Sequence, residues 1–182
     1  AVRRLVLNIV SSLDDRDWFD PVSDLCGDVS KDVRNGALSM TSRLATKYEL
    51  KDALIRILVS HLNAASPGVR ADSASTLGGI GKAEHWTHLA PLLRDSDSGV
   101  RAAAALGLSN LGAAASGPDI VSQLQTERDH WTRIYLAGAT QRLKLATAVE
   151  PLIQWLSDPD QEIRSAAGVA LQTITGERFG VD

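Results

Sequence analysis

One stretch decides the fold of this chain: Asp95-Ser96-Asp97-Ser98-Gly99-Val100-Arg101-Ala102-Ala103-Ala104-Ala105-Leu106-Gly107-Leu108-Ser109-Asn110-Leu111-Gly112. It combines an acidic turn, a β-branched residue followed by arginine, and a helix of small residues that ends at glycine. The same unit recurs at intervals of 31, 36, 31, 32 and 31 residues, with its arginine at Arg3, Arg34, Arg70, Arg101, Arg133 and Arg164. A nearly fixed period of about 20–50 residues is typical of stacked repeat arrays.

The residues that follow each arginine support this alignment. Ten residues after the arginine the chain always carries an aliphatic side chain: Leu13, Leu44, Ile80, Leu111, Leu143 and Ile174. Small or apolar residues recur three residues after it, and the three offsets of 3, 7 and 10 fall on one face of an α-helix. We therefore predict an all-α, right-handed α-solenoid of about five and a half stacked helical hairpins, with a period of about 31 residues.

The predicted array spans residues 1–182 as a single domain. It begins at Ala1, almost inside a helix, and we interpret the sequence as a fragment or module of a longer protein. Second helices of the hairpins are expected at residues 31–45, 98–111, 130–143 and 161–174, with Asp158 as the cap of the last. First helices are expected to start at Asp20-Pro21 and to fill residues 83–94.

Two places depart from the regular pattern. The 36-residue interval carries extra length around residues 46–51, which predicts either a longer loop or an extended first helix. Gly78 and Gly79 lie late in a second helix and are expected to weaken it, because glycine is a poor helix former.

Composition narrows the class of protein. The chain is 44% hydrophobic, 23% charged and only 4% aromatic, which suits a folded protein with an aliphatic core. Its net charge is −3, so we expect no nucleic-acid partner and no membrane partner. Cys26 is the single cysteine and allows no internal disulfide. Neither a long apolar run nor a signal-peptide pattern is present, and we expect a cytoplasmic location.

The repeat motif resembles that of the HEAT-repeat family, in particular the short bacterial-type HEAT-like repeats also found in phycobilin lyases. Residues 151–171 read Pro-Leu-Ile…Leu-Ser-Asp-Pro-Asp…Ile-Arg-Ser-Ala-Ala…Ala-Leu, and residues 91–106 give a second copy. The resemblance covers nearly the whole chain. It is specific for the fold and says little about function, because such arrays serve many roles.

The resemblance also implies a ladder of charges. The family carries an acid six residues before the arginine, and Asp28, Asp95, Glu127 and Asp158 fill that position here, while Ala64 does not. Each arginine would reach the acid of its own turn or of the adjacent turn, which fixes the register between repeats. The predicted structural ladder thus joins these acids to Arg34, Arg70, Arg101, Arg133 and Arg164. The alternative is that the arginine row binds phosphates.

Residues with catalytic or metal-binding chemistry do not converge in the sequence. His85 and His88 are three residues apart, but no further zinc ligand is nominated near them. Cys26 has no adjacent base and is interpreted as a small buried residue. Trp18, Trp86, Trp131 and Trp155 are interpreted as core or cap residues. We therefore predict no catalytic residue, no metal and no cofactor.

The face of the second helices that points away from the core offers a surface for a partner. Stepping 100° per residue from each arginine places offsets 1, 5, 8, 9 and 12 on this face. The candidate partner-binding residues, on what would be the concave face, are Arg43, Leu106, Asn110, Ile134, Gln141, Arg142, Val169 and Gln172. Leu106, Ile134, Leu145 and Val169 would form an apolar seam for a partner's helix or extended segment. The alternative is that curvature buries this seam between neighbouring second helices.

These observations favour a non-catalytic scaffold that binds a protein or peptide partner. A phycobilin-lyase-like enzyme or enzyme subunit is the first alternative. A HEAT-like nucleic-acid-binding or base-excision protein is the second. The identity of the partner and the oligomeric state stay open.

Overall fold

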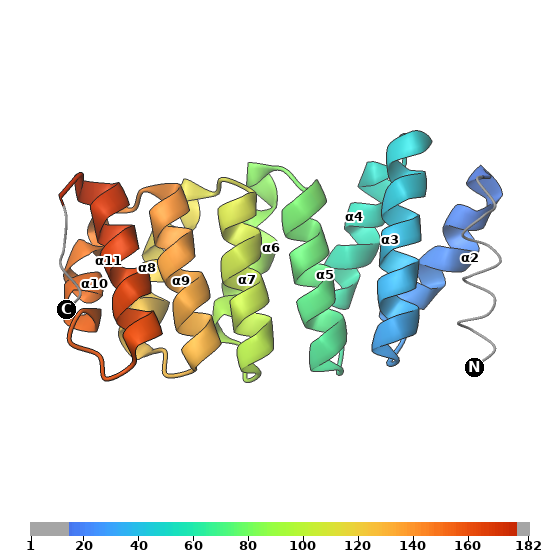
Figure 1. Cartoon of the computed structure of the whole chain (residues 1–182). Coiled ribbons are helices and arrows are strands. Elements are labelled where there is room, and N and C mark those ends of the chain that lie inside the picture. The colour runs from blue at the N-terminus through green and yellow to red at the C-terminus, as the bar shows by residue number, and fades with distance from the viewer. Residues whose placement is uncertain (1–14, 178–182) are drawn as a thin grey trace.

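The longer helices of the described chain form one layer, the front layer in Figure 1. The computed structural model describes residues 15–177 and contains helices and connecting turns, with no strand in that range. The front helices are the second helices of the hairpins: α3 (Lys31–Lys47), α5 (Pro67–Ile80), α7 (Ser98–Asn110), α9 (His130–Leu143) and α11 (Gln161–Thr175). They stand side by side in chain order, so the predicted array of stacked hairpins is confirmed.

The first helices of the hairpins lie behind this layer (Figure 1) and are shorter. They are α2 (Phe19–Ser23), α4 (Lys51–His61), α6 (Trp86–Leu89), α8 (Gly117–Thr126) and α10 (Val149–Trp155). Several are extended by 3₁₀ turns: η1 (Arg16–Trp18), η2 (Asp24–Gly27), η3 (Ala83–His85), η4 (Ala90–Arg94), η5 (Ala114–Ser116) and η6 (Ala146–Ala148).

Two expectations about the first helices are therefore wrong. The expected helix over residues 83–94 is broken into η3, α6 and η4, and the helix expected to start at Asp20-Pro21 starts at Phe19. A proline such as Pro91 cannot donate the backbone hydrogen bond of a helix interior, which favours the tighter 3₁₀ geometry there.

The core lies between the two layers and follows the predicted register. In every described repeat, the residues three and seven after the arginine are fully buried. They are Ala37, Thr41, Ser73, Leu77, Ala104, Leu108, Leu136, Thr140, Ala167 and Leu171, each 0% exposed. Ten residues after the arginine, Leu44 and Leu111 are buried, whereas Ile80, Leu143 and Ile174 are half-buried at the core edge. The copy that begins at Arg3 lies outside the described residues.

Aspartate side chains cap the N-termini of α7, α9 and α11, and one of these caps differs from the prediction. Asp97 and Asp129 cap α7 and α9 by accepting hydrogen bonds from the backbone N–H of Val100 and Thr132. The N-cap of α11 is Asp160 and not Asp158, as Asp160 accepts from the backbone N–H of Glu162. Asp158 does not cap α11; its carboxylate pairs with Arg133 in the charge ladder.

The extra length in the 36-residue interval between Arg34 and Arg70 forms neither a longer loop nor an extended first helix. Most of the extra length extends the second helix, because α3 has 17 residues against 13 to 15 in the other front helices. The chain then turns sharply before α4, with Glu49 in the left-handed region at φ 59°.

Gly78 has a packing role that the sequence did not reveal. A Cβ added at Gly78 would lie 2.3 Å from the Cα of Gly107, so the backbones of α5 and α7 approach closely at this pair. Gly79 points into open space, with no neighbouring atom within 4 Å of an added Cβ. The cost in helix propensity at Gly78 is thus offset by tight packing between adjacent repeats.

Candidate functional site

The arginine of each repeat binds two turns at once. Arg101 makes a bidentate contact with Glu127 of the following repeat, at 2.7 Å from Nε and 2.8 Å from Nη2. Its Nη1 donates to the backbone carbonyl of Asp95 in its own turn at 3.0 Å. The predicted choice between own and adjacent turn is therefore settled: the carboxylate comes from the adjacent turn, and the own turn contributes carbonyl groups.

The arginines of the other repeats pair in the same way, but Arg34 uses an acid at a different position. Arg70 contacts Asp95 at 2.8 Å and Arg133 contacts Asp158 at 2.7 Å. Where Ala64 leaves the acidic position empty, Arg34 instead contacts Asp72, two residues beyond Arg70, at 2.6 Å. The ladder is thus continuous from α3 to α10.

Asp28 and Arg164 are the first and last residues of the ladder in the described chain. The carboxylate of Asp28 accepts from the backbone N–H of Ser30, and its carbonyl accepts from Arg34. Arg164 donates from Nη1 to the carbonyls of Asp158 and Pro159, at 2.8 and 3.1 Å. All nine predicted ladder residues therefore lie in the inter-repeat turns or contact them.

The surroundings of the ladder carboxylates Glu127 and Asp95 lower their pKa values. Burial alone would raise the pKa of Glu127, but hydrogen bonds from Arg101, from Gln123 and from two backbone N–H groups outweigh burial and lower the pKa to about 2. The bidentate contact with Arg70 likewise lowers the pKa of Asp95. Four of the five arginines are bound to carboxylates of the following repeat, so the ladder joins adjacent repeats and leaves no free row of these arginines for phosphates in the described chain.

The candidate partner-binding residues lie on the front layer with unequal exposure. Val169 is 51% exposed, while Leu106 and Ile134 are half-buried. The polar members Arg43, Asn110, Arg142 and Gln172 are exposed, and Gln141 is half-buried. Arg142 donates a hydrogen bond of 2.7 Å to the side-chain carbonyl of Asn110, which links α9 to α7 on this surface.

The predicted apolar seam is only partly present. Leu145 is 8% exposed and lies against Gly117 of α8, so it belongs to the packing and not to the surface. Ala102 and Ser109, also expected to point outward, are buried because the closely spaced front helices cover them. The alternative of burial between neighbouring helices thus holds for these positions.

A groove runs across three front helices and includes Leu106. Its volume is about 300 Å³. Small residues of α5 and α7 line it together with Leu106, Asp72 of α5, and Trp131 and Tyr135 of α9. The full lining is Ala71, Asp72, Ser75, Gly99, Ala102, Ala103, Leu106, Trp131 and Tyr135. We call this set of residues the front groove.

Trp131 and Tyr135 are the feature that sequence reasoning missed. Trp131 is 62% exposed and Tyr135 is 40% exposed, so the interpretation of Trp131 as a core or cap residue is wrong. Their spacing of four residues on one helix was the available signal, because such residues share a helix face. They escaped notice because their offsets from Arg133 differ from the offsets chosen for the outward face.

Trp131 is held next to a cluster of opposite charges. The ring of His130 packs edge-on against Trp131 with 4.9 Å between centroids. His130 also bridges to Asp160 through Nδ1 at 2.8 Å and to Glu162 through Nε2 at 3.0 Å. Desolvation would lower the pKa of His130, but these two carboxylates outweigh it and raise the pKa. This bridge ties α9 to the N-terminus of α11 beside the front groove.

The other tryptophans are structural, as interpreted. Trp155 is 8% exposed, and the guanidinium of Arg133 lies 4.4 Å from its ring centre. Trp18 and Trp86 are half-buried against the core.

The remaining candidate residues have local roles. Cys26 is fully buried, its Sγ lies 3.5 Å from the hydroxyl of Thr41, and burial raises the pKa of its thiol. The rings of His85 and His88 stack at 6.5 Å, and His85 accepts a hydrogen bond from the backbone N–H of Lys82. Within residues 15–177, no group of three or more His, Cys, Asp or Glu side chains is arranged so that it could hold a metal ion.

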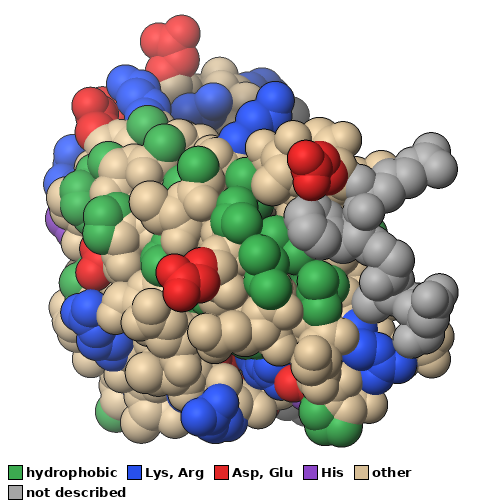
Figure 2. All heavy atoms as spheres, turned by 90° about the vertical axis from the view of Figure 1, so that its left-hand side faces the viewer, with side chains coloured by type: hydrophobic (Ala, Val, Ile, Leu, Met, Phe, Trp, Pro, Cys, Tyr) green, Lys and Arg blue, Asp and Glu red, His purple; other side chains and the backbone are tan. Residues whose placement is uncertain are grey.

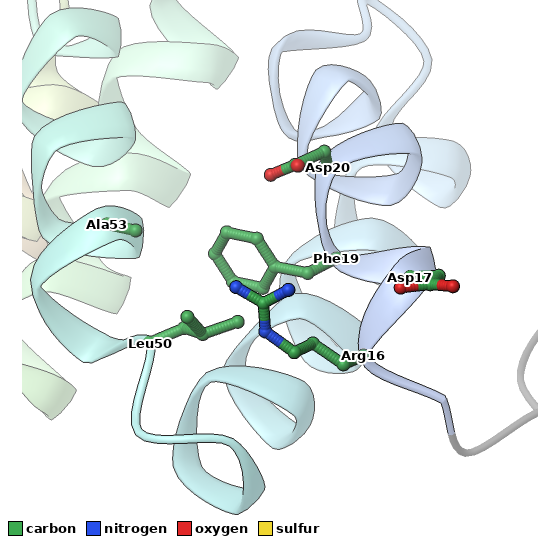
Figure 3. A pocket seen from close by; sticks show the side chains of 6 residues that line it. All are labelled: Arg16, Asp17, Phe19, Asp20, Leu50 and Ala53. Atoms are coloured by element: carbon green, nitrogen blue, oxygen red, sulfur yellow. The ribbon is translucent and has the colours of Figure 1, made fainter.

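A second depression, of about 360 Å³, lies between α2 and the start of α4 (Figure 3). The guanidinium of Arg16 points toward Phe19 and Leu50, while Asp17 points away. It shares no lining residue with the front groove, and we assign it no role. None of the described helices is long and apolar enough to cross a membrane.

This helical architecture resembles that of known repeat proteins. The family model described as HEAT repeats matches residues 55–137. Residues 55–137 therefore carry HEAT repeats. A search of the curated proteins found no match.

Solved structures share the solenoid fold. In the complex of CpcE and CpcF of phycocyanin lyase from Nostoc sp. PCC7120, a chain that is 21% identical matches with a TM-score of 0.70, over 87% of this chain and 65% of the other. This HEAT array thus spans about two thirds of the length of that lyase chain. A designed armadillo repeat protein in complex with the peptide (KR)4 matches with a TM-score of 0.62 at 18% identity, covering 94% of this chain and 91% of that one. An engineered protein, at 19% identity and a TM-score of 0.63, covers 96% and 89% of the two chains.

Proposed function

We propose that this HEAT array is a non-catalytic scaffold that binds a protein partner through the front groove. The observation that carries the proposal is the pair of exposed aromatic side chains, Trp131 and Tyr135, in a groove that small residues and Leu106 also line. Exposed aromatic residues at a depression are typical of protein-binding surfaces, where they supply contact area at low entropic cost. Of the predicted contact residues only Leu106 lines the groove, and the proposal does not rest on Arg43, Asn110, Ile134, Gln141, Arg142, Val169 or Gln172.

The chemistry of the front groove favours an extended segment that carries a lysine or arginine. Asp72, which also pairs with Arg34, is the only charged residue in the lining, and its side chain stays 27% exposed. The faces of Trp131 and Tyr135 attract cations. Glu162, 67% exposed, adds a carboxylate beside His130, whose ring packs against Trp131. The designed armadillo protein of the same fold that binds (KR)4 supports a basic peptide as the class of ligand.

A titration with labelled (KR)4 peptide tests this chemistry. We expect its fluorescence anisotropy to rise on addition of the purified chain, and a Trp131→Ala/Tyr135→Ala double variant to bind at least several-fold more weakly. Val29→Ala is the matched control, because Val29 is 80% exposed in a turn away from the front groove. Equal binding by the parent and the double variant would exclude the groove as the site.

A phycobilin-lyase-like role is the second candidate, favoured by the similarity to the phycocyanin lyase chain. If the array acts on a bilin, adding a free bilin to the purified chain should change its visible absorption spectrum. A spectrum equal to the sum of the components would count against this role. A base-excision role is less favoured, because the carboxylates of Asp160 and Glu162 beside His130 would repel nucleic-acid phosphates.

A further inference from the structure

Among the described carboxylates that bind a ladder arginine, Asp72 alone leaves an oxygen without a partner. Asp95, Glu127 and Asp158 have partners on both carboxylate oxygens, drawn from the arginine and from backbone N–H groups. Asp72 accepts from Nε of Arg34 through Oδ2 alone, at 2.6 Å, and its Oδ1 forms no hydrogen bond or ion pair with residues 15–177. One acceptor of this carboxylate therefore remains for a ligand.

The position of Asp72 in the fold makes this acceptor accessible. Asp95, Glu127 and Asp158 lie where a first helix ends and the chain turns, whereas Asp72 belongs to α5 of the front layer. The Asp72 side chain is 27% exposed, against 2% to 16% for the other three. It also lines the front groove, together with the exposed rings of Trp131 and Tyr135 on α9. The half-used carboxylate is thus the charged residue that a segment in the groove meets.

Arg34 limits which cation can use this carboxylate fully. A guanidinium binds a carboxylate best through two parallel hydrogen bonds, one to each oxygen, as Arg101 binds Glu127. Because Arg34 already donates to Oδ2 of Asp72, a second guanidinium finds only one oxygen without a partner. A lysine ammonium is a compact point charge that needs one oxygen, and its methylene stem packs on apolar surface.

We propose that Asp72 makes the front groove selective for a lysine over an arginine in the bound segment. This inference rests on the proposed function, because it requires that the groove bind a basic segment. The ammonium donates a hydrogen bond to Oδ1 of Asp72, and the stem lies along the groove beside Leu106. The faces of Trp131 and Tyr135 attract either cation, so the difference between lysine and arginine comes from Asp72.

Two labelled peptides of equal length and charge, (KS)4 and (RS)4, test this selectivity by fluorescence anisotropy at one ionic strength. We expect the parent to bind (KS)4 about threefold more tightly than (RS)4, on the scale of a partly exposed ion pair. In Asp72→Asn the amide oxygen still accepts from Arg34, while an NH2 donor replaces the second carboxylate oxygen. This variant should bind (KS)4 more weakly than the parent does and should show no preference between the peptides.

Two control variants separate this effect from general charge and from general apolar contact. Asp119→Asn removes the same charge from α8, outside the groove lining. Figure 2 shows the end of the array that α10 and α11 form, where hydrophobic side chains gather, and Ile153 of α10 is 47% exposed. Ile153→Ser therefore removes exposed apolar surface that does not line the groove. Both controls should keep the lysine preference of the parent.

The outcomes distinguish this inference from the proposed function. Equal affinity of the parent for both peptides, with both weakened by Trp131→Ala/Tyr135→Ala, would overturn lysine selectivity and leave the groove as a binding site. A preference that persists in folded Asp72→Asn would overturn the role of Asp72. Binding of neither peptide, or binding that the aromatic double variant leaves unchanged, would overturn the proposed function as well. The comparison of peptides on the parent needs no variant, so it decides the question even if Asp72→Asn does not fold.

Discussion

Replacing Gly78 by alanine should destabilise the array, although alanine is the better helix former. Glycine to alanine in a helix ordinarily stabilises by about 0.5–1 kcal/mol. At Gly78 the new Cβ would lie 2.3 Å from the Cα of Gly107 and 3.0 Å from its carbonyl oxygen. Both atoms belong to backbone, so a rotamer change cannot relieve the clash and α5 must move away from α7.

The expected magnitude follows from these opposing effects. Overpacking a well-packed contact costs about 1–3 kcal/mol. Since the clash is with backbone, the upper part of this range applies, about 2–3 kcal/mol, and after subtraction of about 1 kcal/mol of helix propensity the net loss for Gly78→Ala is about 1–2 kcal/mol. In a chain of this size that loss lowers Tm by roughly 2–8 °C.

Gly79 provides the matched control one residue away. It lies in the same helix, but no atom lies within 4 Å of an added Cβ. Gly79→Ala should therefore raise the stability by about 0.5 kcal/mol, the usual effect of alanine near a helix end. Differential scanning calorimetry of the parent and both variants gives the comparison. If Gly78→Ala is as stabilising as Gly79→Ala, the close approach of α5 and α7 is refuted.

Three further predictions concern the ladder, the histidine bridge and the core. Glu127→Ala should destabilise by about 3–5 kcal/mol in urea unfolding, because it leaves Arg101 without its buried partner; the stability that Glu127 contributes should be lost as pH falls from 4.5 toward about 2. The raised pKa of His130 contributes stability that is present below about pH 6.5 and is lost as pH rises through the folded-state value, so His130→Gln should flatten this part of the pH profile. Leu111→Ala should cost about 2–5 kcal/mol as a buried truncation.

Each of these has a contrasting control. Arg94 and Asp119 form an exposed pair at 3.4 Å, with Arg94 64% exposed, so Arg94→Ala should change stability by less than about 1 kcal/mol. An equal loss in Arg94→Ala and Glu127→Ala would contradict the role given to burial. A pH profile of Tm that His130→Gln leaves unaltered would exclude the bridge. Leu143 is half-buried, so Leu143→Ala should cost less than Leu111→Ala.

The register of the fold was predictable because it repeats. A face with offsets of 3, 7 and 10 recurs in every copy, and the errors of one copy are corrected by the others. The fully buried Ala104 and Leu108 illustrate this. A local feature that occurs only once cannot be checked against other copies of the repeat. Asp160 rather than Asp158 caps α11, since two aspartates two residues apart offer the same cap chemistry and only the pairing of Asp158 with Arg133 decides between them.

The site was less predictable than the fold, for geometric reasons. The use of Asp72 in place of Ala64 depends on α5 bringing an unrelated helix position to the same point in space as the turn. The burial of Leu145 and Ser109 depends on how closely adjacent front helices approach, which a helical wheel for a single helix does not contain. Trp131 and Tyr135 lie on the one flank of α9 that faces the groove, and this flank is fixed only once α7 is placed beside it.

Affinity capture with the immobilised chain tests the central claim most directly. A native extract is passed over the parent, the Trp131→Ala/Tyr135→Ala variant and the Val29→Ala control, each with unchanged helical circular dichroism, and the retained proteins are identified by mass spectrometry. If the front groove binds a partner, at least one protein is retained by the parent and the control and lost from the double variant. The same set of proteins on all three, or none on the parent, would contradict the claim.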